Sequence, residues 1–321
     1  MKKILTLGLS GLPSYMLARA RMRFFRRSPE DGARVQKILL GRSVALDASD
    51  LEQEYLIKDC VREPENVFLY TAVAKGGLAD VFVDVGANCG HVALQVFDTY
   101  KNLVLIDANP NAIEVLRSIF GAEEKVTFIH AALVNDSSIE FVDLKVPEGS
   151  SGLGSIVHDE SVAGHTYHCK ASTLDAVLES QQGSKIYVKI DVEGAEPSVI
   201  EGGLAALDRL DPVVGFEALS KEAAIESGKF FTDHTFYFGR FGFLDRSGAL
   251  TQSIPGLLGA LITGGSIDIY KTDDLQDLEF DNFSQLVAVR RSKTAAFEVA
   301  LAEHAKNMSN TIALRPRRTI R

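Results

Sequence analysis

The chain has 321 residues, of which 46% are hydrophobic and 24% are charged, and this composition is typical of a folded globular protein. It excludes a disordered, collagen-like or disulfide-stapled protein. The net charge is −9 overall and +7 for residues 1–27, which leaves −16 for the remainder. An acidic body of this kind argues against broad nucleic-acid binding, which needs a basic face.

Residues 1–27 are predicted to form a basic arm, because they contain seven Lys and Arg residues and no acid. The arm imitates a secretory signal, but Pro13 and the arginines that follow it favour a retained segment. Each Lys or Arg near an anionic membrane contributes about 1 kcal/mol, so the arm predicts a peripheral membrane contact. A solvated tail is the alternative. The three cysteines form neither a zinc pattern nor a disulfide framework, which favours a cytoplasmic protein.

Residues 28–76 are predicted to form a helical extension. Ser49 and Glu52 have the Ser-x-x-Glu spacing of a capping box, which satisfies free amides at a helix start. Pro64 fits the first turn of a second helix, and the glycines at 76 and 77 fit its end.

The body of the protein, residues 77–292, alternates β-rich and helical stretches. Its five β-rich runs are VFVDVG (81–86), LVLIDA (103–108), VTFIHAAL (126–133), IYVKIDV (186–192) and VVGFEA (213–218). Most are apolar nearly throughout, as buried parallel strands are, so the sequence predicts a doubly wound α/β sheet. Residues 234–290 are expected to add antiparallel edge strands, and residues 293–321 a C-terminal helix and tail.

About 50 residues separate the third and fourth of these runs. Long inserts in α/β folds are usually functional lids or binding loops, and an exposed hairpin is the alternative. The insert carries three histidines, His158, His165 and His168, which are too few and too poorly partnered for a zinc site. We expect them to be surface residues, and the alternative is that they serve as polar groups or a base facing the substrate.

The sequence DVGANCG after the first strand predicts a ligand-binding turn. Gly86 permits a sharp backbone turn and Gly90 permits close helix packing. The dinucleotide pattern Gly-x-Gly-x-x-Gly is absent, because Asn88 stands at its second glycine position. Asp84 would repel a pyrophosphate and attract a cation. We therefore expect a cationic nucleoside ligand such as S-adenosylmethionine.

Asp107 ends the second strand, 21 residues after Gly86. An acidic residue at this distance is placed to accept hydrogen bonds from ribose hydroxyls, in nucleotide enzymes and methyltransferases alike. Capping roles are the alternatives: Asp84 could cap a turn, and Asp107 could cap the helix that follows it.

Taken together, these segments resemble the FkbM family of S-adenosylmethionine-dependent methyltransferases over residues 65–290. The motifs that carry the resemblance are FVDVGANCG (82–90), IDANP (106–110), AAL (131–133), STLDAVL (172–178) and VKIDVEGAEPSVIEGG (188–203). The resemblance implies a class I methyltransferase (Rossmann-like) fold with a seven-stranded, mostly parallel sheet and one antiparallel strand. It also implies S-adenosylmethionine as cofactor and methyl transfer to a hydroxyl of a sugar, glycan or secondary metabolite.

The resulting candidate cofactor-binding residues lie in the first turn and at the ends of the next strands: Asp84, Gly86, Ala87, Asn88, Gly90, Asp107, Asn109, Ala131 and Asp191. The sequence departs from the family pattern at Asp107, where glutamate is usual, and the shorter side chain predicts a longer or shifted ribose contact. Cys89 replaces an aliphatic residue and is read as a small buried hydrophobe.

The end of the fourth strand offers the candidate catalytic groups. Methylation of a hydroxyl needs an aligned acceptor and a base, and Asp191 and Glu193 lie there beside Lys189. Glu217, at the end of the fifth strand, is the third candidate, because neighbouring carboxylates raise one another's pKa. An ion-paired patch around Lys189 is the structural alternative, and Glu196 fits a helix start better than a base. No metal is expected, although a carboxylate cluster can bind a divalent cation.

Two other functional classes stay open at this point. An NAD(P)-dependent oxidoreductase is disfavoured by Asn88 and by the KIDVEGAE block. A non-catalytic, methyltransferase-like binding module is disfavoured by the intact set of Asp84, Gly86, Gly90 and Asp107.

Overall fold

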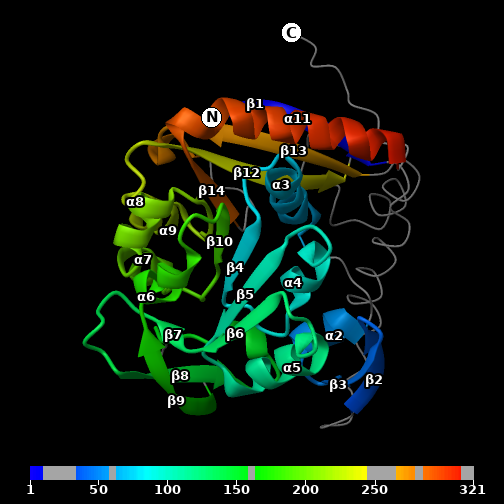
Figure 1. Ribbon diagram of the computed structural model, residues 1–321, viewed down its shortest axis with the longest axis vertical. Helices are drawn as coiled ribbons and strands as arrows, with labels where there is room; N and C mark the ends of the chain where they lie inside the picture. The colour runs from blue at the N-terminus through cyan, green and yellow to red at the C-terminus, as the bar shows by residue number, and fades with distance from the viewer. Residues whose placement is uncertain (10–33, 58–62, 158–162, 244–264, 279–284, 312–321) are drawn as a thin grey trace.

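A nine-stranded sheet forms the centre of the molecule in the computed structural model, which describes residues 1–9, 34–57, 63–157, 163–243, 265–278 and 285–311 (Figure 1). Across the sheet the strands are β1 (Lys2–Leu9), β13 (Gly265–Thr272), β12 (His234–Phe243), β14 (Gln285–Arg290), β11 (Val213–Glu217), β10 (Ile186–Ile190), β4 (Val81–Val85), β5 (Asn102–Asp107) and β6 (Val126–His130). The chain leaves β4 in the middle and winds outward in both directions.

The strand directions match the expected class. β6, β5, β4, β10 and β11 are parallel, and β14 is antiparallel to β11. β12 is antiparallel to β14 and therefore runs with the parallel set. The predicted doubly wound class I methyltransferase fold is confirmed in these seven strands. The predicted strand number is corrected to nine, because β13 and β1 extend the edge in antiparallel fashion.

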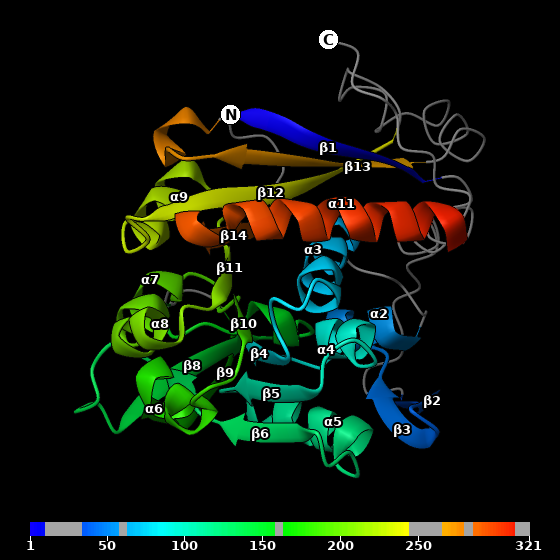
Figure 2. The same cartoon turned by 45° about the horizontal axis from the view of Figure 1, so that its top comes forward.

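Helices cover both faces of the sheet (Figures 1 and 2). One face carries α3 (Pro64–Lys75), α4 (His91–Val96), α5 (Pro110–Phe120) and α11 (Thr294–Thr311), which confirms the predicted C-terminal helix. The other face carries α6 (Leu174–Leu178), α7 (Glu196–Glu201), α8 (Leu204–Leu210) and α9 (Lys221–Gly228). Both faces of the central strands are apolar because both are packed against helices, as the sequence pattern indicated.

The predicted helical extension is wrong for its first half. Residues 34–47 form a hairpin of β2 (Arg34–Leu39) and β3 (Arg42–Asp47), whose two turn residues, Leu40 and Gly41, both have positive φ. Two positive φ values match the twist of a tight hairpin. The second half is helical, with α2 (Leu51–Ile57) and α3, which begins at Pro64 and is capped by Gly76 as expected.

The basic arm is only partly described. Its first residues form β1, the outermost strand of the sheet, where Lys3 donates to Asp268 at 2.7 Å. The alternative of a solvated tail is therefore wrong for residues 2–9, which form a strand of the sheet. The arginines of the arm lie outside the described residues. No helix in the described part of the chain is long and apolar enough to cross a membrane.

The insert between β6 and β10 forms a small sheet of its own. Its strands are β7 (Ala132–Leu133), β8 (Phe141–Pro147) and β9 (Gly164–Ser172), in the order β7-β9-β8. His165 and His168 are exposed on β9, as predicted, whereas His158 lies outside the described residues. The short turns η1 (Ser151–Leu153), η2 (Glu179–Gln181), η4 (Leu275–Asp277) and η5 (Arg291–Lys293) complete the described elements.

Candidate active site

A pocket lies at the carboxyl ends of β4, β5, β10 and β11. It encloses about 1220 Å³ of space, including open solvent at its mouth. This is the edge of a parallel sheet at which α/β proteins bind ligands, next to the point where the strand order reverses. Of the sequence-predicted site residues, all but Asp84 and Gly90 line the pocket.

Gly86 shapes the floor of the pocket. Its φ is +79°, and a Cβ atom at this position would lie 1.8 Å from the carbonyl oxygen of Asp191. The turn therefore brings the backbone of β4 against the backbone after β10, which no residue with a side chain could do. Gly90 serves the packing of two helices instead. A Cβ there would meet Leu116 and Phe120, so this glycine permits α4 to pack against α5.

Asp107 joins the first two strands at the pocket wall. Its carboxylate accepts hydrogen bonds from the backbone N–H of Asn88 at 2.7 Å and of Asn109 at 2.8 Å. Burial raises the pKa of Asp107 to about 6, although these two hydrogen bonds oppose the shift. The carboxylate has further acceptor capacity toward the pocket, since each carboxylate oxygen has two lone pairs.

The capping alternative for Asp107 is resolved by Asn109. The side chain of Asn109 accepts from the Asn111 N–H at 3.0 Å and begins α5. Its Nδ2 atom is buried, has no hydrogen-bond partner in the structure and belongs to a residue that lines the pocket. Ala131 lines the same wall, and its N–H donates to the Asp107 carbonyl. A buried donor without a partner is costly, so this wall suits a ligand that accepts a hydrogen bond.

Asp84 is the one predicted carboxylate that the structure moves away from the ligand. It is fully buried and does not line the pocket. Its Oδ1 lies 3.0 Å from Nζ of Lys189, its register partner on the adjacent strand β10. Burial raises the pKa of Asp84, and Lys189 opposes that shift. The expected direct contact of Asp84 with a cationic ligand is therefore wrong.

Lys189 also reaches the pocket side of the sheet. Its Nζ lies 3.2 Å from Oδ2 of Asp191 and donates to the Gly86 carbonyl at 3.4 Å. Burial alone would lower the pKa of Lys189, but the two carboxylates outweigh burial and raise it. The ammonium thus stays charged between one buried acid and one acid at the pocket.

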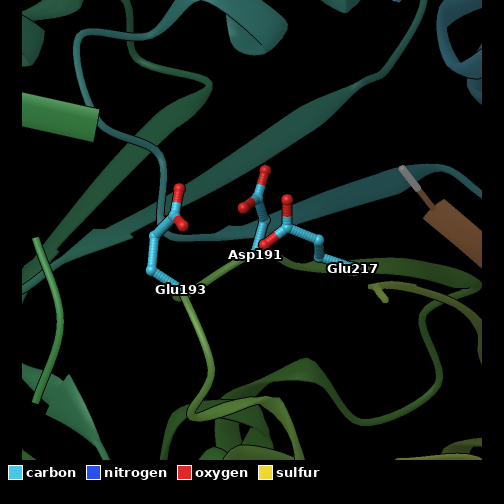
Figure 3. A group of neighbouring side chains, drawn as sticks. All are labelled: Asp191, Glu193 and Glu217. Carbon is cyan, nitrogen blue, oxygen red and sulfur yellow. The ribbon is translucent and has the colours of Figure 1, made fainter. Parts of the chain in front are cut away.

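Three carboxylates converge at the other wall of the pocket (Figure 3). One oxygen each of Asp191, Glu193 and Glu217 lie within 4.8 Å of one another. Asp191 and Glu193 follow β10, and Glu217 ends β11, so the prediction that these three gather is confirmed. Glu193 has φ of +54°, a strained conformation that turns its side chain into the group. Such a group can attract a cation or share a proton.

The crowding has its largest effect on Glu217. Its pKa is raised to about 9. Burial is the largest cause, the charges of Asp191, Glu193 and Glu196 act in the same direction, and Lys189 opposes them. At neutral pH Glu217 is therefore protonated and can donate a hydrogen bond. A protonated acid beside ionised ones is a common way to prepare a site for proton transfer.

Glu196 is a structural member of this region. Its carboxylate accepts from the Val192 N–H at 2.8 Å and from the Gly194 N–H at 3.1 Å. It thereby closes the turn between β10 and α7, which begins at this residue. The interpretation of Glu196 as a helix-start residue is confirmed.

The extension and the insert both supply pocket residues that the sequence did not reveal. Glu52 of α2 and Glu63, just before α3, line the pocket. The Ser49–Glu52 spacing assigned Glu52 to a cap, but Asp50 closes the first turn of α2 by accepting from the Gln53 N–H. No sequence pattern marked Glu52 as a pocket residue, because its burial depends on tertiary packing.

The cap loop, which we define as residues 148–157 of the insert, lines the pocket through residues 151–154 and Ile156 and is held at both ends. Near its start, the Ser151 N–H donates to Asp50 at 2.7 Å, and the Ser151 hydroxyl lies 3.0 Å from Oδ1 of Asn88. Near its end, the Ser155 hydroxyl donates to the Glu193 carbonyl at 2.7 Å. The expectation of a functional loop in the insert is consistent with this placement.

Comparison with known proteins identifies one domain family. The family described as Methyltransferase FkbM domain matches residues 84–244, half of the chain. No match was found among the curated proteins.

Among solved structures, three similar chains are methyltransferases of low identity. The FkbM methyltransferase from Methylobacillus flagellatus is 12% identical with a TM-score of 0.34, over 60% of this chain and 44% of that chain. The tRNA (m1A58) methyltransferase from Aquifex aeolicus is 11% identical with a TM-score of 0.34, over 72% and 69%. An S-adenosylmethionine-dependent methyltransferase from Clostridium acetobutylicum is 13% identical with a TM-score of 0.31, over 78% and 83%. The chain thus spans less than half of the Methylobacillus protein.

Proposed function

The chain belongs to the FkbM family of methyltransferases, and from this premise we propose that it transfers a methyl group from S-adenosylmethionine to a hydroxyl of a sugar, glycan or secondary metabolite. The family and the fold imply this cofactor. The observation that carries the oxygen acceptor is the carboxylate group of Asp191, Glu193 and Glu217, which lies in the same pocket as the Asp107 wall.

The residues of the pocket fit the implied cofactor. Gly86 leaves a cradle that a Cβ would fill, Asp107 offers acceptor capacity for ribose hydroxyls, and Asn109 offers an unpaired donor. These three residues, with Ala87, Asn88 and Ala131, would hold the nucleoside. When bound, S-adenosylmethionine supplies an electrophilic methyl group on a sulfonium ion.

The positive charge of such a ligand needs a negative partner, and Asp84 is not that partner. Asp191, Glu52 and Glu63 line the pocket and supply carboxylates to it. A carboxylate that lines the pocket can lie next to a bound cation, whereas the fully buried carboxylate of Asp84 cannot.

The chemistry expected of the protein is to orient a hydroxyl and accept its proton. Asp191, paired with the Lys189 ammonium, offers an ionised oxygen at the pocket. Glu217, protonated at neutral pH because of its raised pKa, donates a hydrogen bond within the same group. The acceptor hydroxyl would give its proton to Asp191 as it becomes nucleophilic, a contribution of typically about 10²- to 10⁴-fold in rate.

A binding and transfer experiment tests this function. Titration calorimetry should show binding of S-adenosylmethionine and of S-adenosylhomocysteine, and no binding of NAD. Cell extract supplied with the protein and methyl-labelled S-adenosylmethionine should yield a labelled product in which the methyl is attached to oxygen.

Variants of the carboxylates test the assigned roles. Asp191→Asn and Glu193→Gln should each lower methyl transfer and leave the fold intact, whereas Glu201→Gln, an exposed acid of α7 that contacts Asn135, should change nothing. Full activity of both site variants would move the base elsewhere. Cofactor binding without transfer to any acceptor would favour the non-catalytic module, and NAD binding would favour the oxidoreductase.

The membrane contact predicted for residues 1–27 stays a separate proposal. Its test is the loss of binding to anionic liposomes when the arginines of the arm are replaced by glutamine. Unchanged liposome binding would leave the arm without a membrane role.

A further inference from the structure

One buried ammonium connects the two walls of the pocket. Lys189 is 2% exposed and lies within 3.4 Å of three oxygens: Oδ1 of Asp84, Oδ2 of Asp191 and the carbonyl of Gly86. The Gly86 carbonyl accepts a hydrogen bond from Nζ, and the two carboxylates are its ion-pair partners. Gly86 belongs to the turn after β4, which we call the cofactor turn because the cofactor is proposed to bind there. Asp191 belongs to the cluster of three carboxylates that it forms with Glu193 and Glu217.

The position of this ammonium is set by the sheet itself. Lys189 and Asp84 are direct register partners on the parallel strands β10 and β4. Asp84 is fully buried beneath the pocket, and Lys189 is its charged partner. An ion pair held between two central strands does not move with a loop. The Nζ atom of Lys189 is therefore held at a fixed position in the floor of the pocket.

The contact with Asp191 engages one of two carboxylate oxygens. Lys189 binds Oδ2 and leaves the other oxygen outside this contact. Asp191 follows the last residue of β10, where the chain turns toward the strained Glu193. Without a partner below, the Asp191 side chain would be repelled by Glu193, one oxygen of which lies within 4.8 Å of an Asp191 oxygen.

We propose that Lys189 is a positioning residue for methyl transfer: held by Asp84, it fixes the Asp191 carboxylate at the acceptor wall and the Gly86 carbonyl at the cofactor turn. This inference rests on the proposed function and adds to it a role for Lys189, which lines the pocket, and for Asp84, which is buried and does not line it. A misplacement of about 1 Å in such a site costs about 10²-fold in rate.

A double variant separates positioning from simple charge compensation. Lys189→Met alone leaves Asp84 buried without its counter-charge, which can prevent folding. Asp84→Asn/Lys189→Met removes both buried charges and should keep the thermal transition close to that of the native protein. We expect methyl transfer by this folded variant to fall about 10²-fold and its affinity for S-adenosylhomocysteine to fall about tenfold.

The matched control is Lys271→Met, which removes another lysine of the same sheet. Lys271 pairs with Glu298 at 2.6 Å, at the edge far from the pocket. Methyl transfer by this control should be unchanged. If Asp84→Asn/Lys189→Met recovers both the thermal transition and full methyl transfer, Lys189 merely compensates Asp84 and the proposal is overturned.

Two further measurements keep the test decisive. Asp84→Asn alone retains Lys189 and should fold, yet methyl transfer should drop about tenfold through the displaced ammonium; full activity would contradict the proposal. Carbon-13 NMR of Glu217, assigned with Glu217→Gln, needs no cofactor or acceptor. Its titration midpoint should rise in the double variant, because Lys189 lowers the pKa of Glu217 in the native protein. An unmoved midpoint would show that Lys189 does not act on the carboxylate group, even if the protein proves not to be a methyltransferase.

Discussion

The two walls of the pocket are built from different groups. The wall to which we assign the cofactor consists largely of backbone: the Gly86 turn and the Asn88 and Asn109 N–H groups, which the Asp107 carboxylate ties together. The wall to which we assign the acceptor consists of side chains, with three carboxylates crowded beside one ammonium. A backbone wall tolerates almost no change in shape, whereas a wall of charges responds mainly to pH and to neutralising substitutions.

The largest effect is expected from Gly86→Ala, which attacks the backbone wall directly. The new Cβ would lie 1.8 Å from the Asp191 carbonyl, at a φ of +79°. We expect a loss of about 3 kcal/mol in the free energy of unfolding and of about 100-fold in S-adenosylhomocysteine affinity.

Gly183→Ala is the control for this substitution. Gly183 has nearly the same φ, +76°, but a Cβ there would meet nothing within 4 Å. Calorimetry and urea unfolding should give unchanged affinity and a loss of only about 1 kcal/mol. Equal losses in both variants would mean that backbone conformation, and not the close approach to Asp191, is what Gly86 provides.

A smaller effect is expected from Asp107→Asn. The amide keeps the size of the side chain but loses the charged acceptor, so S-adenosylhomocysteine affinity should fall about 10- to 100-fold. Affinity of the native protein should also fall as pH drops below about 6, the raised pKa of Asp107. The variant should lose that pH dependence. Asp80→Asn, which removes a surface partner of Lys101, should retain native affinity.

The acceptor wall should reveal itself through pH. The pKa of Glu217 is raised from 4.5 to about 9, so the folded protein holds this proton more tightly than the unfolded chain does. Its contribution to stability is complete below about pH 4.5 and is lost as pH rises to about 9. Glu217→Gln escapes this loss, so its melting temperature should exceed that of the native protein by more at pH 9 than at pH 5. An equal difference in melting temperature at pH 5 and at pH 9 would contradict the raised pKa of Glu217.

The smallest effect is expected at the cap loop. Asp50→Ala removes the acceptor of the Ser151 N–H and of the Gln53 N–H. The free energy of unfolding should fall by about 1 to 2 kcal/mol, and proteolysis of the cap loop should increase. Asp136→Ala removes a similar acceptor, that of the Ser138 N–H, at an exposed turn that does not line the pocket. Cap-loop cleavage should be unchanged in that control, and an equal increase would disprove the tie.

The wall around Gly86 and Asp107 was largely predictable from the sequence. The wall formed by Asp191, Glu193 and Glu217 was predictable in part. Gly86 and Asp107 follow from local turns and from a fixed spacing along the chain, both of which a sequence displays. The gathering of Asp191, Glu193 and Glu217 follows from strand ends that meet at one sheet edge. The role of Asp84 did not follow, because it depends on which residue lies opposite in register. Lys189 in an otherwise apolar strand was the available signal that a buried acid needed a partner.

Other errors have equally physical causes. The β2–β3 hairpin was missed because its alternation is short and its turn, Leu40–Gly41, carries only one glycine. The pairing of β1 with β13 joins Lys2 to Lys271, and no local pattern can indicate a contact over that separation. Glu52 reaches the pocket only because α2 packs beside the cap loop, which is a tertiary fact.

The outermost pair of strands has a consequence for how the molecule assembles. In the described residues β1 lies at the edge of the sheet and pairs with β13, so it cannot join the sheet before residues 265–272 have been synthesised. Closing so long a chain segment carries a large entropic cost that is repaid late, so this edge should join the sheet last during folding. Residues 2–9, which are synthesised before β13, would then stay unpaired until β13 is available. A bulky fusion ahead of Lys2 would therefore slow the pairing of β1 with β13 more than it would disturb the pocket.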